Sequence, residues 1–176
     1  MLILITGGSG SGKSQYAEDV TVSLGKRRCY LATMFPFDEE CRKKIERHRI
    51  MRKEKGFDTV ECYQGIEMLT LDYDTVLLEC MSNLLANEMY GEKRTEGSVS
   101  DYILEGIRTL SKQVENLIVV SNEVFSDGIE YDEETMKYIS FLGEINRGIG
   151  NMADKVIEVV YSIPVIHKTG KSLVVC

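Results

Sequence analysis

Residues 2–14 read LILITGGSGSGKS, and this stretch decides the fold. Its first five residues are aliphatic or β-branched, which is the pattern of a short buried strand, and they run directly into glycines. Gly7 and Gly12 bracket four residues, and a Lys-Ser pair follows at once, which gives the spacing G-x-x-x-x-G-K-S. The next ten residues favour a helix. A strand, a glycine-rich loop and a helix in this order indicate a phosphate-binding P-loop.

The loop predicts a site for a purine nucleoside triphosphate with Mg²⁺. Its backbone N–H groups are expected to point at the β-phosphate, and the start of the helix adds a partial positive charge. Lys13 is expected to reach the β- and γ-phosphates, while the Ser14 hydroxyl ligates the metal. A glycine-rich turn without a ligand is the weaker alternative, because the strand and the helix are both in place. The predicted phosphate site consists of Gly7, Gly8, Ser9, Gly10, Ser11, Gly12, Lys13 and Ser14.

Further short apolar runs and helical stretches alternate along the chain. The runs are too short for helices and mostly do not alternate, so they predict strands buried on both faces: 29–33, 75–79, 117–121 and 156–161. The expected helices are 14–24, 38–53, 81–90, 98–115 and 132–151. Alternation of this kind predicts an α/β fold of the P-loop NTPase type, RecA-like, with a mostly parallel sheet flanked by helices. We expect one domain over residues 1–176.

Three other segments carry local signals for a helix start, a loop and an edge strand. Ser98, with Asp101 three residues later, resembles a capping box at a helix start. Residues 91–97 are polar and flanked by glycines, which predicts a surface loop. Residues 165–176 alternate weakly, which predicts an edge strand with a loose tail.

Composition narrows the function classes. The chain has 176 residues, a formal net charge of -7 and five cysteines without C-x-x-C spacing. An acidic balance disfavours nucleic acid as a partner, and the cysteines suggest neither a disulfide framework nor a zinc site. No apolar run is long enough to span a membrane. These features predict a soluble protein in a reducing cytoplasm.

Two further residues are candidates for chemistry. Glu79 ends the predicted strand 75–79, where an acidic residue can hold Mg²⁺ or its water shell; the alternative is a carboxylate facing solvent. His48 lies among arginines and a lysine in the predicted helix 38–53. It is either a partly buried helix residue or a nucleophile or acid in an anion site.

In its ordered set of motifs the chain resembles the bifunctional adenosylcobinamide kinase/adenosylcobinamide-phosphate guanylyltransferases of cobalamin biosynthesis. The resemblance covers nearly the whole chain. It is carried by residues 3–8 with Ser11-Gly12-Lys13-Ser14, and by 30–33, 45–49 with Arg52, 59–61, 77–80 with Asn83 and Asn87, 121–124, 128–129, 146–147 and 153–156.

The resemblance implies two reactions: phosphorylation of adenosylcobinamide by ATP or GTP, then GMP transfer from GTP to adenosylcobinamide phosphate, which gives adenosylcobinamide-GDP. It implies that His48 carries GMP as a covalent intermediate and that the family forms trimers. Besides the P-loop, it implies GTP contacts at Ala32, Thr33, Met34, Arg49, Ile50, Met51, Arg52, Glu61 and Glu79. The alternatives are a P-loop small-molecule kinase in which His48 is structural, and a GTP-gated interaction module.

The chain also departs from the family pattern. Ser9-Gly10 stands where the family usually has Ala-Arg, which removes any phosphate contact from that arginine. One extra residue lies between Arg52 and Phe57, and Phe57 replaces the usual tryptophan. The loop at 125–131 is longer by one residue and lacks the usual proline, so contacts to the corrinoid are expected to differ there.

Overall fold

A computed structural model describes residues 1–91, 98–124, 128–129 and 131–170, without the side chains of residues 40, 41, 44, 47, 48 and 51. Its strands form one seven-stranded sheet in the order β3-β2-β4-β5-β1-β6-β7. Every pairing is parallel except that of β6 with β7. The strands are β1 (Leu2–Thr6), β2 (Arg28–Ala32), β3 (Phe57–Glu61), β4 (Thr75–Glu79), β5 (Asn116–Val120), β6 (Lys155–Val160) and β7 (Ile163–Thr169).

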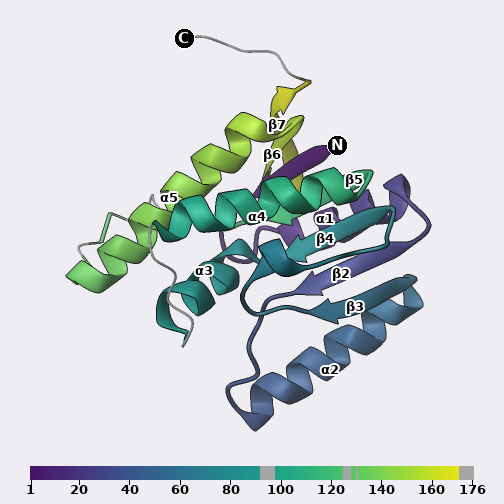
Figure 1. Cartoon of the computed structure of the whole chain (residues 1–176), viewed down its shortest axis with the longest axis horizontal. Coiled ribbons are helices and arrows are strands. Elements are labelled where there is room, and N and C mark those ends of the chain that lie inside the picture. The colour runs from purple at the N-terminus through teal and green to yellow at the C-terminus, as the bar shows by residue number, and fades with distance from the viewer. Residues whose placement is uncertain (92–97, 125–127, 130, 171–176) are drawn as a thin grey trace.

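Helices cover both faces of the sheet. They are α1 (Lys13–Leu24), α2 (Glu39–Glu54), α3 (Met81–Tyr90), α4 (Val99–Gln113) and α5 (Glu133–Met152), with a short 3-10 turn η1 (Ile66–Met68). Figure 1 shows α4 and α5 crossing one face of the sheet, while α2 runs along the β3 edge. None of the helices in the described ranges is long and apolar enough to cross a membrane.

Successive residues of the central strands enter two separate cores. Leu4 and Val119 pack with α3, α4 and α5 on one face, whereas Ile3 and Ile118 pack with α1 on the other. Side chains of a strand alternate between the two faces, so a strand covered on both sides must be apolar throughout. This explains the unbroken apolar runs in the sequence, and it confirms the predicted mostly parallel α/β architecture.

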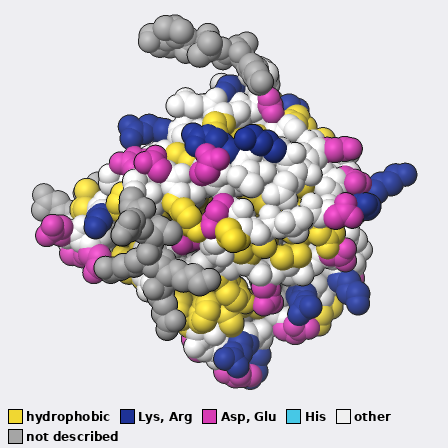
Figure 2. Space-filling view, viewed as in Figure 1, with side chains coloured by type: hydrophobic (Ala, Val, Ile, Leu, Met, Phe, Trp, Pro, Cys, Tyr) yellow, Lys and Arg dark blue, Asp and Glu magenta, His cyan; other side chains and the backbone are white. Residues whose placement is uncertain are grey.

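Parallel pairing brings the carboxyl ends of β1, β2, β4 and β5 to one edge of the sheet. There Ala32 is paired with Glu79 in the register of β2 and β4, and the chain leaves β1 through Gly7. Ligands of open parallel sheets bind at this edge. The surface around it carries both signs of charge, and Figure 2 shows acidic and basic side chains interspersed over one face of the molecule.

The structure corrects several local predictions. Residues 57–61 form strand β3, which was not among the expected strands. Ser98 precedes α4, but its side chain makes no capping hydrogen bond; its hydroxyl lies 2.7 Å from that of Ser100 instead. Strand β7 begins at Ile163, two residues before the expected edge strand. The predicted tail at 171–176, residues 92–97 of the predicted loop and most of the departing loop at 125–131 lie outside the described residues.

Candidate functional site

The P-loop joins β1 to α1 in a conformation that requires glycine at two positions. Gly12 immediately precedes α1 in the left-handed region, with φ of 89°. Gly7 has φ of 153°, and a Cβ atom there would lie 2.5 Å from the carbonyl oxygen of Val159. Only glycine adopts such backbone angles at little cost, and it has no side chain to meet the neighbouring strand. The loop therefore lies directly against β6, with the start of α1 directed at any bound anion.

Lys13 is already folded over the loop. Its Nζ donates to the carbonyl oxygen of Gly8 at 3.0 Å. Burial lowers the pKa of Lys13, while the negative charge of Glu79 acts in the opposite direction. Lys13 directly precedes Ser14, which lines the same pocket as Glu79.

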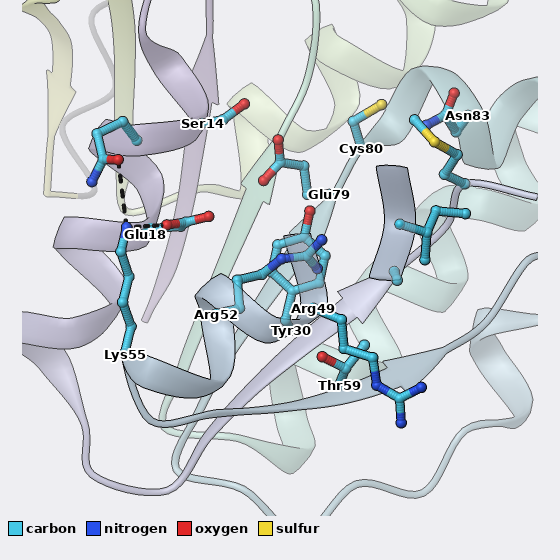
Figure 3. Close-up of a pocket in the computed structure, with 14 residues that line it drawn as sticks. Ser14, Glu18, Tyr30, Arg49, Arg52, Lys55, Thr59, Glu79, Cys80 and Asn83 are labelled. Carbon is cyan, nitrogen blue, oxygen red and sulfur yellow. Dashed lines mark hydrogen bonds and ion pairs between the residues drawn. The ribbon is translucent and has the colours of Figure 1, made fainter. Parts of the chain in front are cut away.

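A pocket of about 450 Å³ opens beside the loop, between α1, α2 and the ends of β2 and β4. Ser14 and Glu79 line it, and Figure 3 shows their side chains directed toward each other. Oε2 of Glu79 is buried and has no hydrogen-bond partner among the described residues. A hydroxyl and a carboxylate are the oxygen ligands that Mg²⁺ takes, usually together with substrate phosphates and water. The residues present therefore fit a Mg²⁺ ion bound with a nucleotide.

Tyr30 and Arg52 form the wall of the pocket nearest Glu79. The guanidinium carbon of Arg52 lies 3.5 Å from the centre of the Tyr30 ring, and only 8% of Arg52 is exposed. A cation stacked on an aromatic face in a dry site is favourable by about 2 kcal/mol. Burial, followed by the charge of Glu79, raises the pKa of Tyr30, while Arg52 opposes the shift. Tyr30 thus stays protonated, with its hydroxyl toward Glu79 in Figure 3.

An ion pair closes the other side of the pocket. Lys55, which follows α2, pairs with Glu18 of α1 and also contacts Oε1 of Gln15 at 3.4 Å (Figure 3). Gly56 has a positive φ of 75° and donates its N–H to the carbonyl oxygen of Lys53. This glycine ends the α2 segment and turns the chain into β3. The ion pair between Lys55 and Glu18 fixes the end of α2 against α1.

The sequence-predicted residues divide into those that line the pocket and those that do not. Ser14, Ala32, Met34, Arg49, Arg52 and Glu79 line it. Thr33 is buried and holds the backbone instead: its hydroxyl accepts from the N–H of Cys80 and donates to the Cys80 carbonyl, both at 2.8 Å.

Four other predicted residues do not line the pocket or have side chains outside the described ones. Ile50 is 56% exposed, and Glu61 is exposed at the end of β3; neither lines the pocket. Position 48 lies within α2, but the side chains of His48 and Met51 are outside the described ones. Their predicted roles therefore remain predictions.

Several residues of the pocket were not among the predicted site residues. Lys55, Glu18 and Gln15 line it, as do Tyr30, Thr59 and Asn83, which carry the family resemblance but had no predicted role in the site. The one available signal was that Tyr30 precedes Ala32 by two residues in a strand, so both side chains lie on the same face of the sheet. Glu123, which follows β5, supports the P-loop, because its N–H donates to the Gly7 carbonyl at 3.1 Å; its neighbour Asn122 instead donates to the Ser82 hydroxyl of α3 at 2.6 Å.

Known proteins that are similar to this chain in sequence point to one family. The sequence profile described as "Cobinamide kinase / cobinamide phosphate guanyltransferase" matches residues 3–166. Two relatives are named bifunctional adenosylcobalamin biosynthesis protein CobU. The one from Salmonella typhimurium is 27% identical and the one from Escherichia coli is 29% identical, each over 94% of this chain and 98% of the relative. The relative from Pseudomonas aeruginosa, named CobP, is 26% identical over 92% of this chain and 94% of its own length.

Among solved structures, the RadB recombinase has a similar fold, with a TM-score of 0.50. It is 15% identical in sequence, and the match covers 89% of this chain and 73% of that one. At this identity the likeness concerns the fold alone. It supports the predicted P-loop NTPase architecture of the RecA type.

Proposed function

Because this chain belongs to the cobinamide kinase / cobinamide phosphate guanyltransferase family, we propose that it phosphorylates adenosylcobinamide and then transfers GMP to the phosphate. The observation that carries the proposal is one pocket lined by Ser14, which directly follows the P-loop lysine Lys13, and by Glu79, whose Oε2 has no hydrogen-bond partner among the described residues. A P-loop with a neighbouring acid is what transfer of a γ-phosphoryl group requires.

In the kinase reaction, the hydroxyl of the aminopropanol arm attacks the γ-phosphorus of ATP or GTP, and the nucleoside diphosphate leaves. Lys13 and the loop N–H groups stabilise the negative charge that spreads over the transferred phosphoryl oxygens. Ser14 and Glu79 are the residues that would hold Mg²⁺, which when bound neutralises phosphate charge. Arg52, held on Tyr30, presents a second fixed positive charge to the pocket.

In the guanylyltransferase reaction, a neutral imidazole of His48 attacks the α-phosphorus of GTP. A phosphorus–nitrogen bond forms, the α–β phosphoanhydride bond breaks, and pyrophosphate leaves. The phosphate of adenosylcobinamide phosphate then attacks the same phosphorus, which releases His48 and gives adenosylcobinamide-GDP.

The spacing of α2 supports His48 in this role. Ile45, Arg49 and Arg52 line the pocket, and they lie four and seven residues apart on one face of the helix. Position 48 is three residues after Ile45 and four before Arg52, so it belongs to the same face. Attack on phosphorus requires the neutral ring, because a lone pair on an imidazole nitrogen is the nucleophile.

The two reactions and their alternatives differ in their products. The protein is incubated with Mg²⁺, GTP and adenosylcobinamide, and phosphate, pyrophosphate and the mass of the corrinoid are followed. We expect pyrophosphate together with a corrinoid that carries GDP. A kinase without the second activity would stop at the phosphorylated corrinoid without pyrophosphate, and a GTP-gated module would leave the corrinoid unchanged.

We also propose that the chain assembles as a trimer. The β6–β7 hairpin supports this, because Tyr161, Ile163 and Ile166 are 90%, 64% and 61% exposed. Large apolar side chains exposed on an edge strand and on its turn favour a protein contact. Light scattering on the purified protein measures the mass, and a monomer would contradict the proposal.

A further inference from the structure

Beside the pocket, the chain exposes aromatic side chains that the nucleotide chemistry does not use. The segment that leaves β2 carries Met34, Phe35 and Phe37, which are 37%, 43% and 79% exposed. In Figure 2 hydrophobic side chains reach the surface where the segment between β2 and α2 runs. Exposing a large apolar side chain such as Phe37 is unfavourable by a few kcal/mol compared with burying it, so such a group of side chains usually marks a binding surface.

These side chains are packed into one unit with Tyr63. The ring centres of Phe35 and Phe37 are 5.1 Å apart, and those of Phe35 and Tyr63 are also 5.1 Å apart. The Tyr63 hydroxyl donates to Oε2 of Glu61 at 2.8 Å, which holds the third ring in place. We call Phe35, Phe37 and Tyr63 the aromatic rim.

The backbone beneath the aromatic rim is fixed to the site. The side-chain amide of Asn87 donates to the carbonyl oxygens of Thr33 at 2.8 Å and of Tyr63 at 3.0 Å, so α3 holds both segments. Met34 lines the pocket that contains Glu79, and Phe35 is the next residue. The rim is therefore continuous with the phosphoryl-transfer site.

The size of the pocket determines which substrate can bind inside it and which must bind at the rim. A pocket of about 450 Å³ is in the range that holds one small-molecule ligand, and the proposed function places a nucleoside triphosphate in it. A corrinoid is a larger macrocycle that carries its reactive hydroxyl at the end of a side arm. Only the arm can enter beside the γ-phosphate, so the ring must lie on the surface at the mouth of the pocket.

From these observations we propose that the aromatic rim binds the corrin macrocycle of cobinamide, with the hydroxyl arm extending past Met34 toward the γ-phosphate. The inference rests on the proposed function and adds a substrate-binding surface to it. A broad ring with an apolar, methylated periphery matches a cluster of rigid aromatic side chains, which supply contact area at small cost in conformational entropy.

The first test measures binding without turnover. Cobinamide absorbs visible light, so equilibrium dialysis gives its dissociation constant directly for the unchanged protein, for Phe37→Ala and for Phe35→Ala. Loss of one well-buried aromatic contact is expected to weaken binding about tenfold. Val22→Ala is the control. Val22 is 37% exposed near the end of α1, where its carbonyl accepts from Arg28 at the start of β2, whereas the rim follows the far ends of β2 and β3; cobinamide binding by this variant should be unchanged.

Steady-state kinetics distinguish an effect on binding of the corrin macrocycle from an effect on binding of the nucleotide. Phe37→Ala should raise the KM for cobinamide about tenfold, while the KM for GTP stays within about twofold of the unchanged protein. Formation of the GMP–enzyme from GTP alone should also be unaffected. A rise in the KM for GTP instead would show that the base of the nucleotide occupies the rim, and it would overturn the inference.

A fluorescence experiment detects the contact between cobinamide and the aromatic rim directly. The chain contains no tryptophan, so Phe37→Trp introduces a single fluorophore at the rim, and Val22→Trp introduces one far from it. Cobinamide should quench the first more strongly than the second. Equal quenching, unchanged cobinamide binding in both alanine variants, or a loss of assembly in Phe37→Ala would each refute the proposal. If the unchanged protein binds cobinamide without transferring phosphate, the proposed function fails while the binding surface stands.

Discussion

Replacing Gly7 with alanine should destabilise the protein, whereas the same change at Gly8 should not. Gly7 has φ of 153°, and a Cβ atom there would lie 2.5 Å from the carbonyl oxygen of Val159 in β6 and 2.8 Å from the Ser11 hydroxyl. Gly8 has nothing within 4 Å of the corresponding position. The two glycines are neighbours in the same loop, so Gly8→Ala is the matched control.

The expected loss of stability in Gly7→Ala is the sum of two contributions. Holding alanine at an unfavourable φ costs about 1–3 kcal/mol. Moving the backbone of β6 away from the new methyl group costs about another 1–3 kcal/mol, as overpacking does in protein interiors. For a chain of this length, a loss of about 4 kcal/mol lowers the Tm by roughly 8–16 °C. Gly8→Ala should stay within about 0.5 kcal/mol, as ordinary surface substitutions do.

Thermal unfolding followed by circular dichroism, without nucleotide, measures both variants. Urea unfolding at 25 °C checks that the m-value is unchanged, so that a shift of the midpoint reports stability. If Gly7→Ala melts within about 2 °C of Gly8→Ala, the close contact between the P-loop and β6 is not a determinant of stability, and the reasoning is wrong.

Three further predictions concern Lys13, Glu79 and the buried cysteine Cys29. Lys13→Ala should abolish phosphorylation of cobinamide while circular dichroism shows an intact fold, because the lysine acts on the transferred phosphoryl group. Turnover near the rate of the unchanged protein would exclude this role for Lys13. Glu79→Gln should weaken Mg²⁺-dependent activity more than metal-free nucleotide binding, since the amide lacks the charge that holds the cation; equal losses would make Glu79 structural. Burial raises the pKa of Cys29 to about 12, so this thiol should remain unmodified by iodoacetamide at pH 8 in the folded protein; peptide mass mapping that finds it modified before unfolding would contradict its burial.

The central strands could be predicted because burial on both faces makes them apolar throughout. Strand β4, in which Val76, Leu77 and Leu78 are buried, was found from sequence. Strand β3 was missed because it lies at the edge of the sheet, and only Phe57 of its five residues is buried. Its sequence, FDTVE, therefore lacks the apolar run that identified the others.

The site could be predicted only where the chemistry depends on local spacing. Lys13 and Ser14 were identified because a P-loop places them directly after its last glycine. The stacking of Arg52 on Tyr30 joins a helix to a strand, and no pattern within either segment indicates it. The same holds for the aromatic rim, in which Tyr63 of one segment packs against Phe35 of another.

The central claim is that His48 carries GMP, and labelling tests it most directly. The protein is incubated with Mg²⁺ and GTP radiolabelled at the α-phosphate, and protein-bound label and released pyrophosphate are measured together. The label should be acid-labile and base-stable, as a phosphoramidate is, and it should appear with an equal amount of pyrophosphate. His48→Ala should lose the label but keep kinase activity, because γ-transfer uses the P-loop. His167→Ala is the control, since its ring is bound to Glu158 at 2.8 Å on the β6–β7 hairpin, and it should label normally. Label that persists in His48→Ala would contradict the claim.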